Sequence, residues 1–171
     1  GEFVRALRGR PTEALAEAVA DAMTINETFF FREDAQFERF AEATLPALAA
    51  ARTSGVVRVW CAACSTGQEP YSLAMILKEE EAKLKGWRYE IVGTDIATDV
   101  LARAKEGLYS QFEVQRGLPV QLLLKYFDKA ADLGHAPVLV GDHDGVLPVA
   151  PRLAVLAPRA VRPILLGDLL A

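Results

Sequence analysis

A loop of small residues follows an apolar run and contains an acidic residue near its end. Glu69 lies near the end of the loop Cys61–Pro70 (CAACSTGQEP), which comes directly after Val56–Trp60. Small residues let a backbone approach a ligand closely, and the start of a helix presents N–H groups and a positive dipole end. Glu69 can offer its carboxylate there to an ammonium or hydroxyl group. The alternative is a tight strand-to-helix connection that binds no ligand.

A second acid, Asp95, follows the next apolar run, Tyr89–Thr94. A carboxylate at the end of a second parallel strand suits the two hydroxyls of a ribose. Its alternative role is to cap a helix or turn. The loop contains no G-x-G-x-x-G pattern and no G-K-[ST] follows, which disfavours a ligand with a pyrophosphate or triphosphate. The two acids together favour an adenosine ligand without phosphates and with an ammonium-bearing tail.

A third candidate is the segment Thr24–Asp34 (TINETFFFRED), which holds Asn26, Thr28 and Arg32 beside three phenylalanines. A guanidinium group can hold a carboxylate or position a ligand. The simpler interpretation is an ordinary helix start, with buried phenylalanines and with Arg32 paired to a neighbouring carboxylate. These residues alone leave both interpretations open.

The pair Cys61 and Cys64 allows two other chemistries. A Trp-Cys-x-x-Cys run after a strand is typical of thioredoxin-like redox proteins, in which the first thiol lies at a helix N-terminus. Here residues 65–67 separate Cys61 from the expected helix, so its pKa should not be strongly lowered. Two cysteines are too few for structural zinc unless His135 and His143 join them. We therefore expect two packing residues and no metal site.

Helices and strands alternate around these residues. Apolar spacing predicts helices over about 12–23, 34–48, 69–86, 98–107 and 119–127, with Asp34 and Thr98 as caps. Because Val56–Trp60 and Tyr89–Thr94 are separated by a helix, we expect them to be adjacent and parallel. This order predicts an α/β fold, the first half of a doubly wound sheet.

The chain changes in character after Lys129. No aromatic residue follows Phe127, and both histidines lie in this part. Three apolar runs, Val138–Val140, Leu153–Leu156 and Ile164–Leu166, have the length of short strands between proline and glycine turns. We divide the chain into a helix with a linker (1–23), an α/β domain (24–129) and an atypical tail (130–171).

The composition disfavours several classes of protein. The chain has 171 residues, of which 51% are hydrophobic and 25% charged, an ordinary mixture for a soluble domain. A net charge of -4 gives no reason to expect nucleic acid as a partner. No apolar run is long enough to cross a membrane, and the start lacks the apolar centre of a signal peptide. A cytoplasmic protein is the simplest expectation.

Four stretches together resemble the chemotaxis receptor methyltransferases, the CheR family. They are Thr24–Glu33 (TINETFFFRE), Val57–Ser72 (VRVWCAACSTGQEPYS), Ile91–Ile96 (IVGTDI) and Tyr109–Leu118 (YSQFEVQRGL). Their order and spacing also match, and the resemblance extends from about residue 14 to 127. It implies a Rossmann-like fold that uses S-adenosylmethionine to methylate glutamate side chains on the cytoplasmic helical region of chemoreceptors.

The resemblance also assigns roles to residues of this chain. Six carry over as cofactor contacts: Asn26, Thr28, Arg32, Glu69, Asp95 and Ile96. Glu69 is expected to meet the methionine end of the cofactor, Asp95 the ribose, and Ile96 the adenine. Arg32 is expected to lie near the site of methyl transfer as well, which makes it the candidate catalytic residue.

Two features of the family are not recognisable in this sequence. Residues 1–23 match only the last helix of the family's N-terminal helical domain. After Ala130 we find neither the small β-subdomain nor the later strand and cofactor contacts. We therefore expect a fold incomplete at its C-terminal end, with its open sheet edge covered by tail strands or by self-association, and activity below that of a longer relative. The alternative function is a non-catalytic module that binds S-adenosylmethionine or S-adenosylhomocysteine.

Overall fold

A computed structural model describes residues 2–51, 55–84, 87–129, 137–140 and 153–156. Its helices are α1 (Glu2–Arg8), α2 (Glu13–Met23), α3 (Asp34–Arg39), the π-helical turn Phe40–Thr44, α4 (Leu45–Ala51), α5 (Gln68–Glu79), α6 (Thr98–Glu106), α7 (Gln111–Gln115) and α8 (Val120–Tyr126). Its strands are β1 (Val56–Ala62), β2 (Arg88–Thr94), β3 (Leu108–Ser110), β4 (Phe127–Lys129), β5 (Pro137–Val140) and β6 (Leu153–Leu156).

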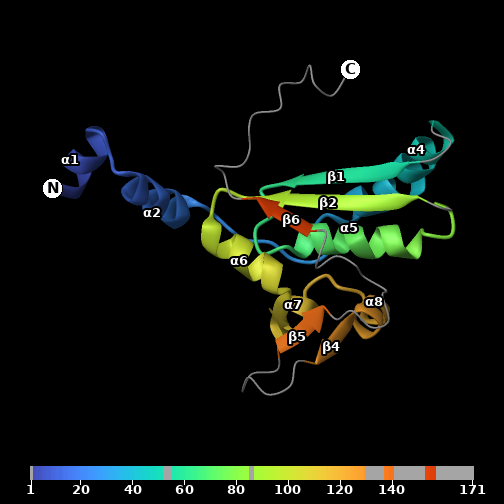
Figure 1. The fold of residues 1–171 in the computed structure, drawn as a ribbon. Coiled ribbons are helices and arrows are strands. Elements are labelled where there is room, and N and C mark those ends of the chain that lie inside the picture. Colours follow the sequence, from blue (N-terminus) through green and yellow to red (C-terminus); the bar gives the residue numbers. More distant parts are fainter. Residues whose placement is uncertain (1, 52–54, 85–86, 130–136, 141–152, 157–171) are drawn as a thin grey trace.

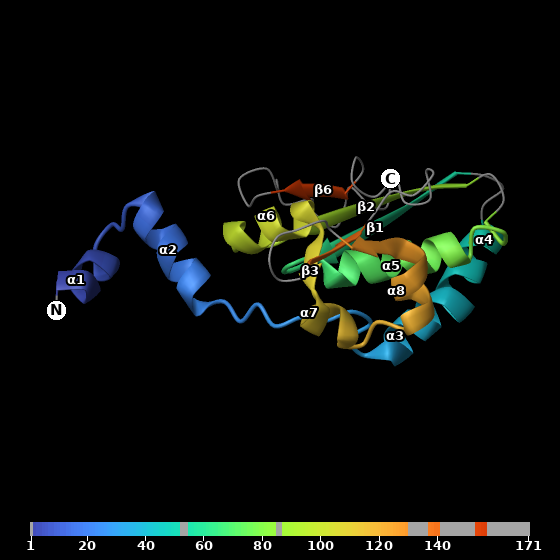
Figure 2. The same cartoon turned by 90° about the horizontal axis from the view of Figure 1, so that it is seen from below.

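The larger sheet is parallel and has the order β1-β2-β6 (Figure 1). Val56 is in register with Arg88, and Ala62 with Thr94, so both strands end at the same edge. The predicted adjacency and direction of these two strands are therefore confirmed. The helix α5 connects them and lies along one face of the sheet (Figures 1 and 2). This strand–helix–strand order is the α/β unit that the sequence predicts.

The tail contributes a strand to this sheet. Leu153 of β6 is in register with Ile91 of β2, and Leu156 with Thr94. The expectation that tail residues add to the sheet is thus confirmed for Leu153–Leu156. The third apolar run, Ile164–Leu166, lies outside the described residues.

A smaller antiparallel sheet has the order β3-β5-β4. Its central strand, β5, comes from the tail, and Val138 is in register with Tyr109 on one side and Lys129 on the other. The predicted strand at Val138–Val140 is therefore confirmed, but it pairs in this second sheet, and the small β-structure after Ala130 was not recognised in the sequence. Its two flanking strands have only three residues each, which is too short for an alternating pattern to stand out in the sequence.

The helices α1 and α2 stand apart from the sheets (Figures 1 and 2). The predicted start of α2 is confirmed, because Thr12 caps the helix by accepting a hydrogen bond from the Leu15 N–H at 3.3 Å. No residue of α2 is buried, so its apolar stripe does not join the core. In the described part of the chain, no helix is both long and apolar enough to span a membrane.

Three predicted helix boundaries were wrong. Asp34 and Thr98 are the first residues of their helices, and Glu33 and Ala97 occupy the cap positions before them. The helix α5 ends at Glu79 rather than near residue 86. Glu80 and Glu81 follow, and their backbone continues as turns instead of a regular helix.

An aromatic cluster forms the part of the core next to the loops. Phe30 is completely buried, and its ring centroid lies 4.9 Å from that of Tyr109 and 5.5 Å from that of Phe127, both edge-on. Tyr109 also contacts Tyr71 of α5, with centroids 5.9 Å apart. Such edge-to-face pairs add to the burial of apolar area. They attach the segment around Phe30 to two strands of the smaller antiparallel sheet, β3 and β4, and through Tyr109 to α5.

Candidate functional site

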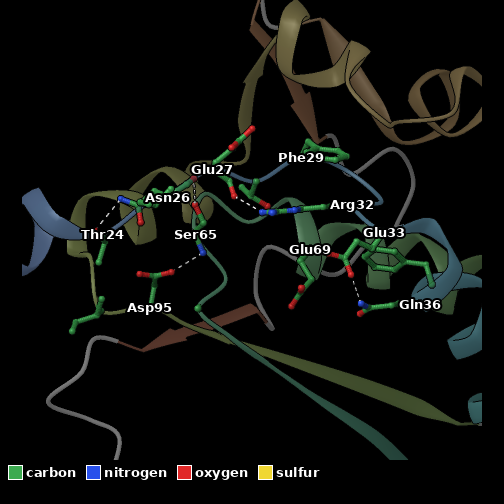
Figure 3. A pocket seen from close by; sticks show the side chains of 15 residues that line it. Thr24, Asn26, Glu27, Phe29, Arg32, Glu33, Gln36, Ser65, Glu69 and Asp95 are labelled. Atoms are coloured by element: carbon green, nitrogen blue, oxygen red, sulfur yellow. Dashed lines mark hydrogen bonds between the residues drawn. The ribbon is translucent and has the colours of Figure 1, made fainter.

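A cavity of about 430 Å³ opens at the carboxyl ends of β1 and β2 (Figure 3). We call residues 61–70, together with Asp95 and Ile96, its inner wall, and the segment Thr24–Glu33 its outer wall. The six residues predicted as ligand contacts all line this one cavity: Asn26, Thr28, Arg32, Glu69, Asp95 and Ile96. The prediction that Glu69 and Asp95 face the same pocket is therefore confirmed as geometry.

The inner wall has an unusual backbone. Ala63, Ser65 and Gly67 adopt left-handed conformations, with φ of 57°, 49° and 96°. Residues other than glycine rarely do so, and they persist where the surroundings hold them. Here the Asp95 side chain stabilises the loop backbone. Its Oδ2 accepts a hydrogen bond from the Ser65 N–H at 2.8 Å, and its Oδ1 accepts one from the Ala97 N–H at 2.9 Å. With only 9% of its surface exposed, Asp95 fixes the loop that surrounds the cavity.

Gly67 brings the loop close to α6 and β3. A Cβ atom at this position would lie 3.0 Å from the Tyr109 hydroxyl and 3.1 Å from the Ala104 Cβ. The Tyr109 hydroxyl also donates a hydrogen bond to the Thr66 carbonyl at 2.8 Å, which connects the loop to β3. The helix α5 begins directly afterwards at Gln68, so the loop can turn sharply into the helix. Only a residue without a side chain fits this turn without displacing its neighbours.

The outer wall is attached to the inner wall by two hydroxyl groups. The Ser65 hydroxyl donates to the Asn26 carbonyl at 2.8 Å. The buried Ser72 hydroxyl accepts from the Phe31 N–H at 3.0 Å and donates to the Gln68 carbonyl at 2.7 Å. Both serines belong to the motif around the loop, so the motif builds the attachment as well as the cavity.

Arg32 lies on the outer wall and is exposed. Its Nη1 donates to the carbonyl of Glu27 at 2.8 Å, and its guanidinium carbon lies 5.9 Å from the centre of the Phe29 ring. The simpler interpretation of this segment, a helix start with Arg32 paired to a neighbouring carboxylate, is therefore wrong in its pairing. The burial of the phenylalanines, which the same interpretation expects, is partly confirmed, because Phe30 is buried while Phe29 is only half-buried.

The charges of the two walls are complementary to a zwitterion. The inner wall carries the carboxylates of Glu69 and Asp95, and the outer wall carries the guanidinium of Arg32 together with the carboxylates of Glu27 and Glu33. A carboxylate has about four acceptor positions, and backbone N–H groups occupy two of those of Asp95. Two remain for hydroxyl donors of a ligand. Ile96, which is 57% exposed, adds an apolar surface at the rim for the face of an aromatic ring.

The two thiols do not have the properties of a redox pair. Both cysteines are free and buried. Burial, together with the charge of Asp95, raises the pKa of the Cys64 thiol to about 11. Burial and the charge of Glu69 raise the pKa of Cys61 further still. The prediction that the thiol pKa values are not strongly lowered is confirmed, and the thiolate needed for exchange chemistry is disfavoured.

Metal chemistry has little support in the described part of the chain. No three side chains of histidine, cysteine, aspartate or glutamate gather there in a way that could hold an ion. The two histidines considered as partners of the cysteines, His135 and His143, lie outside the described residues.

Among the outer-wall residues that line the cavity but were not predicted as contacts, Glu27 has a partner far away in the sequence. Glu27 lines the cavity between the predicted contacts Asn26 and Thr28. Its carboxylate pairs with Arg116, which is far away in the sequence, at 2.7 Å. No local spacing signals such a pair, because it depends on how the turn after α7 folds back on this segment.

Comparison with known proteins identifies the family of the chain. Residues 26–139 match the family described as "CheR methyltransferase, SAM binding domain". The chain is 42% identical over 132 residues to "Chemotaxis protein methyltransferase 1" of Pseudomonas aeruginosa, which covers 75% of this chain and 47% of the relative. It is 38% identical over 131 residues to "Chemotaxis protein methyltransferase Cher2" of Pseudomonas putida, covering 75% of this chain and 48% of the relative.

A third relative covers more of the chain. The "Chemotaxis protein methyltransferase" of Escherichia coli is 34% identical over 154 residues, 90% of this chain and 48% of the relative. The chain thus spans about half the length of the curated relatives that it matches.

Proposed function

Because the chain belongs to the CheR methyltransferase family, whose domain binds S-adenosylmethionine, we propose that the protein methylates glutamate side chains on the cytoplasmic helical region of chemoreceptors. The observation that supports this most directly is convergence: residues from three separate stretches of chain line one cavity. Its volume of about 430 Å³ lies within the range of small-molecule sites. We place the reaction in the cytoplasm, where the receptor helices lie.

The inner wall suits the nucleoside half of the cofactor. In our proposal, Asp95 accepts hydrogen bonds from the two ribose hydroxyls with the acceptor positions that Ser65 and Ala97 leave open. Ile96 packs its exposed side chain against the adenine. Glu69, in the first turn of α5, meets the ammonium group at the methionine end.

The outer wall suits the remaining polar groups. In our proposal, Arg32 pairs with the carboxylate of the cofactor and also lies near the methyl group, while Asn26 and Thr28 contribute polar contacts between the two ends. Both roles depend on where the Arg32 guanidinium lies, because it must reach the cofactor carboxylate and the region of the methyl group from one position. The hydrogen bond to the Glu27 carbonyl fixes that position in the structure.

The reaction makes few demands on proton transfer. When bound, S-adenosylmethionine supplies a methyl group on a positively charged sulfur. A glutamate carboxylate is ionised at neutral pH, so it attacks the methyl carbon without a general base. The C–O bond forms as the C–S bond breaks, which yields a methyl ester and S-adenosylhomocysteine. The contribution of the chain is alignment and exclusion of water, with Arg32 orienting the incoming carboxylate.

A binding module without catalysis is the second candidate. It is favoured by the fact that the described residues lining the cavity all fall within 24–96, so a candidate cofactor pocket is present in the described part of the chain. Under this proposal the chain holds S-adenosylmethionine or S-adenosylhomocysteine, and methyl transfer requires further contacts.

Two measurements test these functions. Calorimetry should show that S-adenosylhomocysteine binds, and Glu69→Gln should weaken binding by about 1–3 kcal/mol because a charged hydrogen bond is lost. The matched control Glu106→Gln, on the exposed end of α6, should leave affinity unchanged. Transfer of a radiolabelled methyl group to a receptor fragment, released as methanol by base, separates the two candidates. Absence of ligand binding by the folded chain contradicts both.

A further inference from the structure

The turn after α7 presses directly against the outer wall. Gly117 has a left-handed backbone with φ of 81°, and a Cβ atom there would lie only 2.0 Å from the carbonyl oxygen of Phe30. Real side chains do not approach a backbone atom that closely, so this position requires glycine. The contact brings Arg116, the preceding residue, beside the same segment.

Arg116 contacts the outer wall through two different interactions. Its Nη2 lies 2.7 Å from Oε1 of Glu27, and its guanidinium carbon lies 4.4 Å from the centre of the Phe29 ring. A planar guanidinium can pair with a carboxylate and lie over an aromatic face at the same time. Arg116 itself is not among the residues that line the cavity.

Arg32 contacts the same two residues. It donates to the backbone carbonyl of Glu27, whereas Arg116 binds the side chain of Glu27. It also lies within 5.9 Å of the Phe29 ring, whereas Arg116 lies within 4.4 Å. Glu27 and Phe29 therefore each contact two guanidinium groups, one from a residue that lines the cavity and the other from a distant turn.

We propose that Arg116 is a positioning residue for the cofactor pocket: by fixing Glu27 and Phe29, it sets where Arg32 presents its guanidinium to the ligand. This inference rests on the proposed function, because it takes S-adenosylhomocysteine as the ligand that reads the position of Arg32. It also makes the turn between α7 and α8, which lies outside the pocket, part of the machinery that determines affinity.

The burial of the pair distinguishes positioning from simple stabilisation. Arg116 and Glu27 have 44% and 58% of their side chains exposed. Exposed ion pairs contribute little to folding, because water and salt screen them. Loss of Arg116 should therefore change the melting temperature little, while it releases a wall of the cavity. A residue with a merely structural role would show the opposite balance.

Calorimetry with S-adenosylhomocysteine is the first test. Arg116→Gln should raise Kd about fivefold to twentyfold, the size of a typical coupling between two sites. Arg116→Lys keeps the charge but not the planar group over Phe29, so it should recover only part of the affinity. The matched control is Arg58→Gln, which removes an Arg–Glu pair of the same 2.7 Å length on the sheet, away from the pocket. An unchanged Kd in Arg116→Gln overturns the proposal.

Hydrogen exchange of the ligand-free protein provides a second test that does not depend on the ligand. In Arg116→Gln, amides of residues 27–32 should exchange faster, whereas Arg58→Gln should leave them unchanged. If the wild-type chain fails to bind S-adenosylhomocysteine but this exchange increases, the proposed function fails and the positioning by Arg116 stands. If neither variant changes the exchange of these amides, Arg116 does not position the outer wall.

Discussion

The two walls of the cavity contain the same kind of strained backbone but are held in different ways. On the inner wall, Ala63 and Ser65 are left-handed, and buried hydrogen bonds to Asp95 hold the loop. On the outer wall, Phe31 and Glu33 are left-handed, with φ of 54° and 60°. Exposed charged groups and the half-buried Phe29 lie along that segment, and it reaches the inner wall through two serine hydroxyls.

This difference indicates that the two walls of the cavity differ in rigidity. Hydrogen bonds in a buried, low-dielectric place are strong and costly to break, so the inner wall has one geometry. Exposed ion pairs are weak and screened, so the part of the outer wall around Glu27 and Arg32 can shift at less cost than the buried Phe30. In the proposed function, the inner wall would hold the nucleoside in a fixed place, whereas the outer wall would adjust around the methyl group and the incoming carboxylate.

The largest expected effect follows from removing Asp95. Asp95→Ala leaves two buried N–H groups without acceptors, so the free energy of unfolding should fall by about 2–4 kcal/mol. Where the variant still folds, its affinity for S-adenosylmethionine should fall by about 1–3 kcal/mol, because the ribose hydroxyls lose their acceptor. Urea unfolding and calorimetry measure the two effects.

Asp99→Ala is the control for this change, since Asp99 is exposed in the first turn of α6. Its unfolding free energy should stay within about 0.5 kcal/mol of the wild type. A stability loss in Asp95→Ala no larger than that of the control would show that Asp95 does not hold the inner wall. An unchanged dissociation constant in the folded variant would remove its ribose role.

The next effect concerns the turn into α5. Gly67→Ala places a Cβ within 3.0–3.2 Å of Tyr109 and Ala104 on a backbone with φ of 96°. We expect a loss of about 1–3 kcal/mol of unfolding free energy in a urea titration. Gly9→Ala is the control, because a Cβ there meets only ordinary contacts at 3.6–3.7 Å. Equal effects of the two substitutions contradict the view that the inner wall tolerates one geometry only.

The link between the walls should matter less than either of these. Ser72→Ala removes the acceptor of the Phe31 N–H and the donor to the Gln68 carbonyl, so about 1–2 kcal/mol of stability should be lost. The outer wall should also become freer, which calorimetry with S-adenosylhomocysteine would register as weaker binding. Thr98→Ala deletes an exposed hydroxyl in α6 and serves as the control. Unchanged binding in Ser72→Ala would mean that the walls hold their positions independently.

The sequence predicts the inner wall better than the outer wall, for a physical reason. The order of strand, loop and helix fixes where Glu69 and Asp95 lie, because parallel strands end at a common edge. Local pattern is sufficient there. What it does not reveal is that Asp95 also supports the loop backbone, since this depends on the left-handed conformation of Ser65.

The outer wall depends on contacts between residues far apart in the chain. The pair of Glu27 with Arg116 and the close approach of Gly117 to Phe30 arise only after the turn beyond α7 has folded back. The small sheet was missed for the same reason, because β5 finds its partners in β3 and β4. Periodicity along the chain carries no information on such pairings.

The smallest expected effect is the response of the outer wall to pH and salt. The hydrogen bond from Arg116 lowers the pKa of Glu27 below its usual value of 4.5. A carboxyl whose pKa is lowered by folding stabilises the protein fully above its unfolded pKa, and this contribution disappears as the pH falls through the lowered value. The difference in melting temperature between the wild type and Glu27→Gln should therefore be small and constant above pH 4.5 and vanish in stronger acid. It should also shrink in 1 M salt, where the screening length is about 3 Å.

Comparison with Glu27→Gln isolates the Glu27–Arg116 pair from Glu79 and Glu113, whose pKa values are lowered as well. A difference that persists in acid or in high salt would mean that Glu27 acts through packing, and the two walls would then be held more alike than we infer.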